Sequence, residues 1–208
     1  DIFDILEKIY ENRRKLRFII MSNGFYITKD IAKRLKDLNI EAFQISIEGE
    51  EQTNDYIRGK GAFKKIIEAA KILVEEGVNT SFSFTATSIN NKEYFRVLEI
   101  AKSLGVDSVW SDRLVPWGAG KQIQDQMLQP STLKEHYEKI TKISKQLDKT
   151  GSKTRLMRNR TLYFMADSER QDRIPWANHC DGVGKRGMTI LPNATVYPCR
   201  RLPIKVEN

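Results

Sequence analysis

The chain has 208 residues, of which 40% are hydrophobic and 30% are charged, and this composition is typical of a globular protein. No apolar run approaches the roughly 18 residues needed to span a bilayer, so we expect no membrane partner. The net charge of +8 permits an anionic partner, but the lysines are spread over polar helix faces, so nucleic acid is not expected. Two cysteines are too few for a disulfide scaffold, which favours a cytoplasmic location.

Helix and strand patterns alternate along the first part of the chain. Apolar residues at helical spacing predict helices over residues 2–10, 31–38, 63–74 and 92–104. Short apolar or alternating segments predict strands over residues 18–21, 42–47, 80–87 and 108–113. This order favours an α/β fold with parallel strands, either a TIM-type (βα) barrel or a doubly wound sheet. No Gly-x-Gly-x-x-Gly follows a strand, which weakens the dinucleotide-binding version.

The composition changes after Gly120. Residues 130–147 carry the pattern of one amphipathic helix, whereas residues 149–175 are polar and irregular. Beyond them, Cys180 and Cys199 flank a strand–turn–strand pattern. We therefore divide the chain into a partial barrel over 1–127, a helical linker over 128–175 and a small cysteine-bearing β-hairpin region over 176–208.

The two cysteines suggest a metal site without completing one. Thiols that flank a hairpin can clamp a metal ion, but a closed zinc or iron–sulfur site needs four ligands. Cys180 and Cys199 therefore either share a metal with ligands beyond residue 208 or have no such role.

Each of the predicted strands ends in polar residues, and in parallel α/β folds functional groups gather at these ends. The second strand alternates Gln44, Ser46 and Glu48 with isoleucines, and the third alternates hydroxyl residues with phenylalanines. If the apolar face packs on helices, the polar face lines a cavity that holds a polar ligand. A half-exposed edge strand would show the same alternation. With all four strands in view, we favour the cavity.

Individual residues near these strand ends suit ligand binding. Glu48-Gly49 suits a carboxylate that contacts a ribose hydroxyl, although a solvated glutamate is commoner. Arg58 precedes a helix and could bind a carboxylate, or lie on the surface of a glycine-rich turn. His136 falls in the middle of a predicted helix, and we expect it to be solvated. With only two histidines, neither a zinc hydrolase nor a Ser-His-Asp triad is supported.

In chain order, these segments resemble the radical S-adenosylmethionine (SAM) enzymes, specifically those with a C-terminal SPASM or twitch extension. The similarity lies in five elements at family spacing: Met21 to Gly24, Gln44 to Gly49, Asn54 to Phe63, Asn90-Asn91 and Arg113 to Gly120. Glu48 stands where the family usually has Asp. Cys180 and Cys199 are similar to the first cysteines of the SPASM pattern. The Cys-x3-Cys-x2-Cys loop of the family is missing, so we expect an internal fragment of a longer protein.

The resemblance implies that the parent protein reductively cleaves SAM at a [4Fe–4S] cluster, and that the 5′-deoxyadenosyl radical takes a hydrogen atom from a substrate. It implies a peptide or protein substrate and a reductant such as ferredoxin or flavodoxin. No catalytic residue is assigned. The implied roles are Ser46 and Glu48 at the ribose, Asn23 shaping the cavity, Arg58 at the SAM carboxylate, the backbone near Leu114 at the adenine, and Cys180 and Cys199 on an auxiliary [4Fe–4S] cluster.

The alternative is a non-catalytic α/β binding module that recognises a peptide or nucleic acid through its basic surface. The sequence upstream of Asp1 discriminates between the two hypotheses, since the cluster-binding loop is either encoded there or not. Steeply salt-dependent binding of nucleic acid would favour the module.

Overall fold

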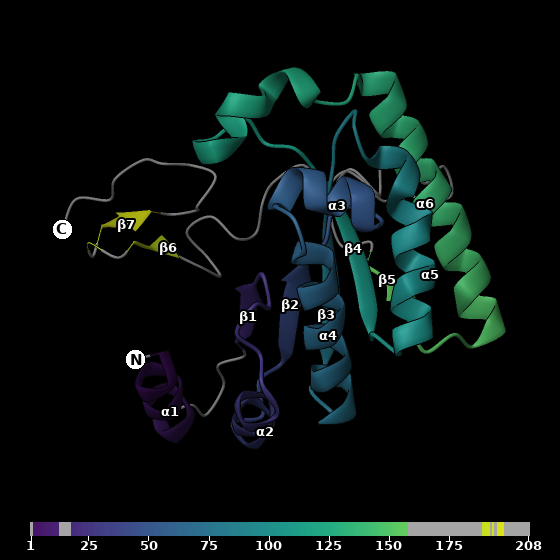
Figure 1. Cartoon of the computed structure of the whole chain (residues 1–208). Helices are drawn as coiled ribbons and strands as arrows, with labels where there is room; N and C mark the ends of the chain where they lie inside the picture. Colours follow the sequence, from purple (N-terminus) through teal and green to yellow (C-terminus); the bar gives the residue numbers. More distant parts are fainter. Residues whose placement is uncertain (1, 13–17, 158–188, 192, 194, 198–208) are drawn as a thin grey trace, which may run out of the picture. The chain divides into compact units, whose positions relative to one another are not determined.

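The computed structural model describes residues 2–12, 18–157, 189–191, 193 and 195–197 (Figure 1). The chain divides into two compact units. The first comprises residues 1–114 and 126–158, and the second comprises residues 115–125 and 159–208. The three-part division made from the sequence stays a prediction.

The first unit is built on one parallel sheet with the strand order β1-β2-β3-β4-β5. The strands are β1 (Ile19–Ser22), β2 (Ala42–Ser46), β3 (Thr80–Ala86), β4 (Ser108–Arg113) and β5 (Arg155–Leu156). Strands that follow one another in the chain are neighbours in the sheet, and helices connect them, because parallel pairing needs a long crossover. The predicted α/β fold with parallel strands is confirmed. The short β5 falls in the segment that we interpreted as an irregular linker.

One helix precedes β1, and further helices and two 3₁₀ segments lie between the strands of the parallel sheet. They are α1 (Ile2–Asn12), α2 (Lys29–Asp37), α3 (Glu51–Arg58), α4 (Ala62–Glu75), η1 (Asn91–Glu93), α5 (Tyr94–Leu104), η2 (Gly118–Gln126) and α6 (Pro130–Thr150). The predicted helices are confirmed except at their ends. Helix α3 is an addition, since its sequence is polar and buries only Asn54, so no apolar periodicity marks it.

Local side-chain bonds explain where two of these helices begin. The Thr28 hydroxyl accepts a hydrogen bond from the backbone N–H of Ile31 at 3.3 Å and so caps α2. The Asp55 carboxylate accepts bonds from the N–H groups of Gly61 and Phe63, at 2.6 and 2.8 Å, where α4 begins. These two N–H groups, with Phe63 the stronger, lower the pKa of Asp55.

The core of the first unit lies between the sheet and helices α4 and α5, which pack on β2, β3 and β4 (Figure 1). The sheet contributes almost fully buried apolar side chains: Phe43, Ile45, Phe82, Phe84 and Val109. The helices contribute Ile66, Ala70 and Leu73 from α4 and Tyr94, Val97 and Ala101 from α5. Burying each large apolar side chain contributes about 1.5–3 kcal/mol, which holds the helices on this face. The phenylalanines of β3 therefore face the helices, as predicted.

In the second unit, β6 (Thr189–Ile190) and β7 (Val196–Tyr197) form an antiparallel hairpin. The backbone N–H of Leu191 donates to the carbonyl of Thr195 at 2.9 Å, and the Asn193 side chain accepts from the N–H of Thr195 at 3.2 Å. Asparagine commonly holds a turn in this way. The predicted strand–turn–strand pattern is confirmed, while Cys180 and Cys199 lie outside the described residues. Within the described part of the chain, no helix is long and apolar enough to cross a bilayer.

Candidate functional site

One face of the parallel sheet presents polar side chains at alternate positions. Ser46 of β2 pairs with Ser83 of β3, and Thr85 of β3 pairs with Asp112 of β4. Residues paired in parallel strands point to the same face, which here is opposite to the face that α4 and α5 cover. The three hydroxyl residues are half-buried, and Asp112 is buried. Three neighbouring strands thus carry a row of hydroxyls and a carboxylate toward their C-terminal ends.

Glu48 follows β2, and its carboxylate is buried and paired. The residue is only 5% exposed. Its Oε1 accepts a hydrogen bond from Arg58 Nη2 at 2.6 Å, and its Oε2 accepts one from the backbone N–H of Thr85 at 3.0 Å. Burial raises the pKa of Glu48, while the charge and hydrogen bond of Arg58, followed by the N–H of Thr85, oppose that rise. The structure therefore brings Glu48 and Arg58 together as an ion pair.

Two fully buried asparagines hold the backbone beside this carboxylate. Asn54 Oδ1 accepts from the N–H of Glu48 at 2.9 Å. Asn90 Nδ2 donates to the carbonyls of Glu48 and Thr85, at 3.0 and 3.1 Å. Asn90 Oδ1 accepts from the N–H and the hydroxyl of Thr87, at 2.8 and 2.9 Å. The Asn90 amide therefore joins the end of β2 to the end of β3, while the Asn54 amide joins Glu48 to α3. The sequence indicated Asn90 as one of the polar residues after the third strand and as part of a family motif, but not these bonds.

A second carboxylate lies at the N-terminus of α3. Glu93 accepts from the backbone N–H of Glu50 at 2.7 Å and from the Thr53 hydroxyl. A negative charge is favourable there because the first N–H groups of a helix point outward. Gly49 makes this approach possible, since its φ is +152° and an added Cβ would overlap Glu93 Oε2 and lie 3.0 Å from Thr53 Cβ.

Asn23 and Leu114, the other predicted contacts of the first unit, lie at the same edge of the sheet. Asn23 follows β1, is exposed, and accepts a bond from the N–H of Phe25 at 3.1 Å. Leu114 follows β4, is buried, and donates its N–H to the carbonyl of Ala86 at 3.4 Å. Both lie at this edge because the C-terminal ends of parallel strands are on the same side of a sheet. Contacts of these residues with SAM stay predictions.

The described residues suit SAM better than an iron–sulfur cluster. Half-buried hydroxyls at Ser46, Ser83 and Thr85 can pair with the polar atoms of an adenosyl group. A [4Fe–4S] cluster needs cysteine thiolates, and the two cysteines lie outside this part of the chain. Within the described residues, no three His, Cys, Asp or Glu side chains come together to hold a metal ion.

His136 shows that one expectation was wrong. It is 5% exposed, and its Nε2 lies 2.9 Å from Oγ of Ser111 in β4. The rings of Tyr94 and His136 pack in a T-shaped arrangement, with 5.3 Å between their centroids. Burial, followed by the charge of Lys139, lowers the pKa of His136 to about 4. His136 precedes buried Ile140 by one helical turn, and this spacing is the signal that could have placed it in the core.

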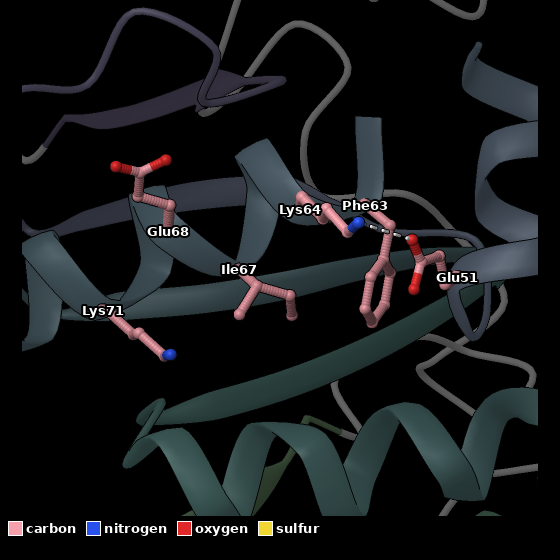
Figure 2. Close-up of a pocket in the computed structure, with 6 residues that line it drawn as sticks. All are labelled: Glu51, Phe63, Lys64, Ile67, Glu68 and Lys71. Atoms are coloured by element: carbon pink, nitrogen blue, oxygen red, sulfur yellow. Dashed lines mark ion pairs between the residues drawn. The ribbon is translucent and has the colours of Figure 1, made fainter. Parts of the chain in front are cut away.

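A groove of about 290 Å³ lies elsewhere on the surface of the first unit (Figure 2). It is lined by Glu51, Phe63, Lys64, Ile67, Glu68 and Lys71. Figure 2 shows the ion pair between Lys64 and Glu51, whose Nζ and Oε1 are 3.6 Å apart. The groove has both charges in equal number and includes no predicted site residue.

Curated proteins with similar sequences are enzymes by name. Fe-coproporphyrin III synthase of Methanosarcina barkeri is 25% identical over 174 residues, which are 83% of this chain and 39% of that protein. A probable GTP 3′,8-cyclase of Saccharolobus islandicus is 29% identical over 135 residues, which are 64% of this chain and 44% of that protein. The matches thus span 39% and 44% of the length of these relatives.

Solved structures share the fold at low sequence identity. Streptococcus suis SuiB bound to S-adenosylmethionine matches with a TM-score of 0.73 at 15% identity, over 96% of this chain and 46% of that one. Native anSMEcpe with bound AdoMet and the Cp18Cys peptide matches with a TM-score of 0.68 at 18% identity, over 97% of this chain and 58% of that one. These matches confirm the predicted partial (βα) barrel. The model of the radical SAM superfamily matches residues 1–90 of this chain.

Proposed function

We propose that the chain is part of a radical SAM enzyme that binds SAM at the C-terminal edge of the parallel sheet and modifies a peptide or protein. The row of polar side chains on Ser46, Ser83 and Thr85, on a sheet of this superfamily, is the observation that carries the proposal. A [4Fe–4S] cluster would supply the electron that cleaves SAM into methionine and a 5′-deoxyadenosyl radical. The protein would orient the cofactor and exclude water around it.

The strand ends would divide the contacts with SAM among them. The half-buried hydroxyl of Ser46 is proposed to bond the ribose, with Glu48 as a weaker contact because its carboxylate is almost fully buried. Arg58 has a side chain that is 25% exposed, so donors that Glu48 does not use would reach the SAM carboxylate. Asn23 would shape the cavity, and the backbone near Leu114 would meet the adenine.

The names of structural neighbours support a peptide substrate. SuiB has been solved with the precursor peptide SuiA, and anSMEcpe with the Cp18Cys peptide. On this proposal Cys180 and Cys199 bind an auxiliary [4Fe–4S] cluster together with further ligands. A cytoplasmic ferredoxin or flavodoxin would be the reductant.

A tetrapyrrole is the second candidate substrate. Fe-coproporphyrin III synthase aligns with 83% of this chain. AdoMet-dependent heme synthase, also from Methanosarcina barkeri, is 28% identical over 124 residues. Since the relatives are enzymes by name, they favour either substrate over a non-catalytic binding module.

The test is reductive cleavage of SAM by the full-length protein, reconstituted anaerobically with its iron content verified. Under dithionite we expect 5′-deoxyadenosine, and its absence would refute the enzymatic proposal. Added peptide that changes in mass in step with 5′-deoxyadenosine supports the peptide proposal. Formation or consumption of Fe-coproporphyrin III in its place assigns the tetrapyrrole.

The proposed cluster ligands have a separate test. Cys180→Ala combined with Cys199→Ala should lower the iron content per chain, because thiolates are the ligands of such clusters. Iron is measured after reconstitution of the variant and of the unsubstituted protein side by side. Unchanged iron would exclude both residues as ligands.

A further inference from the structure

The amide of Asn90 is fully used inside the protein. Its two N–H groups go to the carbonyls of Glu48 and Thr85, and its oxygen accepts from the N–H and the hydroxyl of Thr87. An asparagine amide offers two donors and one oxygen with two lone pairs, so these bonds exhaust its capacity. The residue is also 0% exposed. Asn90 therefore holds other groups in place and has no capacity left for a ligand.

The bonds of Asn90 lie where the paired register of β2 and β3 ends. The last paired residues of the two strands are Ser46 and Ser83, and the N–H of Ile47 still donates to the carbonyl of Ser83 at 2.9 Å. One step further, the N–H of Thr85 donates to the Glu48 carboxylate and its carbonyl accepts from Asn90. On the side of Thr85 that faces away from β4, side chains thus make the bonds that β2 makes to the earlier residues of β3.

These bonds lie next to the polar row. Ser46 precedes Glu48 by two residues, so both side chains point to the same side of the extended chain. Thr85 itself belongs to the row, opposite Asp112. Fixing the carbonyls of Glu48 and Thr85 on one amide therefore fixes the spacing between the Ser46 and Thr85 hydroxyls.

We propose that Asn90 is a positioning residue that sets the spacing of the polar row and thereby the affinity for SAM. This rests on the proposed binding of SAM at that edge. The role requires an amide: a carboxylate would keep the acceptor for Thr87, but it would place negative charge against two carbonyl oxygens in a buried site. Aspartate should therefore fail as completely as alanine.

The structural half of the proposal is tested by hydrogen exchange on the full-length protein. In Asn90→Ala the N–H of Thr87 loses its acceptor, so its protection should fall by about tenfold or more. Asn91→Ala is the matched control, because it removes an amide one residue further on, in a half-buried position. Unchanged protection at Thr87 in Asn90→Ala, or an equal loss in Asn91→Ala, would overturn the proposal.

The functional half is tested by the kinetics of SAM cleavage. Asn90→Ala and Asn90→Asp should raise the KM for SAM by about tenfold while kcat changes by less than about threefold, because the row binds cofactor before reaction. A smaller active fraction would lower kcat at constant KM, and that result would contradict positioning.

If Asn90→Ala fails to fold, Thr87→Val removes one bond to Asn90 and should raise the KM for SAM by a smaller factor. An unchanged KM in this variant would also contradict the proposal. If the unsubstituted protein releases no 5′-deoxyadenosine, the proposed function is refuted. Hydrogen exchange at Thr87 would still decide whether Asn90 holds the two strand ends in place.

Discussion

The sheet of the first unit has a buried ionisable side chain on each of its faces, and the two differ in how they are accommodated. Glu48, beyond the end of β2, faces the guanidinium of Arg58 at 2.6 Å. His136, on the helix-covered face, meets the uncharged hydroxyl of Ser111 at 2.9 Å. Burial disfavours the charged form of both, but only Glu48 has a counter-charge. The C-terminal edge of the sheet thus contains an ion pair, whereas the core contains a neutral pair.

The largest expected effect comes from removing the counter-charge. Arg58→Met should lower the free energy of unfolding by about 3 kcal/mol near pH 8, because the buried Glu48 carboxylate loses its partner. The pKa of Glu48 is already raised, and it would rise further, so the deficit should shrink as the pH falls toward the unfolded-state pKa. Urea denaturation at two pH values measures both effects. Adding Glu48→Gln should restore much of the loss, and a double variant as unstable as Arg58→Met would contradict this account.

The neutral pair should respond to acid in the opposite sense. The pKa of His136 is about 4 in the folded protein, below its unfolded value, so the unfolded state binds a proton first as the pH falls. The free energy of unfolding should therefore be constant above about pH 6.5 as far as His136 is concerned. It should fall by up to about 3 kcal/mol as the pH drops to about 4. His136→Gln removes the titrating group, so the unfolding free energy of this variant should fall less steeply between about pH 6.5 and 4. Equal slopes for the two proteins between pH 7 and 4.5 would show that His136 does not titrate in this way.

Gly49 probes how tightly the C-terminal edge of the sheet is packed. Gly49→Ala adds a Cβ that overlaps the Glu93 carboxylate, whereas Gly59→Ala, also at positive φ, meets nothing within 4 Å. Both variants strain the backbone, so Gly49→Ala should lose about 1 kcal/mol more than Gly59→Ala. Thermal and urea unfolding of the pair measure the difference. If the two losses are equal, Glu93 moves aside freely and the edge is looser than described.

The smallest expected effect is on the core pair. Ser111→Ala removes the hydroxyl that meets His136 Nε2, which should cost about 1 kcal/mol of unfolding free energy. Ser108→Ala is the control, since Ser108 lies in the same strand but is only half-buried, and it should change stability by less than about 0.5 kcal/mol. An equal loss in the two variants would mean that the bond to His136 contributes nothing measurable.

The fold could be predicted largely from the sequence because periodicity reports burial. The alternation of phenylalanines and hydroxyls in β3 is a period-two signal, and it gave both the strand and its helix-facing side. Helix α3 has no such signal, because Asn54 is its one buried residue. We expected His136 to be solvated because histidine is polar. Its position one helical turn before the buried Ile140 would have placed it in the core.

The site could be predicted only in part. The residue types at the strand ends pointed to Glu48 and Arg58 individually, and their motif gave the expected contacts with SAM. Nothing in the sequence indicated that they bond to each other across ten positions. Asn90 and Glu93 act through bonds to the backbone of a different loop, and such contacts leave no periodic pattern in the chain.

The replacement of strand pairing by side-chain bonds at Thr85 has a consequence for the width of the sheet at this edge. Backbone hydrogen bonds between paired strands fix one distance between the strands. The distance that a side chain covers changes with each methylene it contains. Glu48 bonds the N–H of Thr85 here, in a position where the resembled family usually has the shorter aspartate. Strand separation at this edge would then be adjustable by single substitutions, while the remainder of the sheet keeps its alignment.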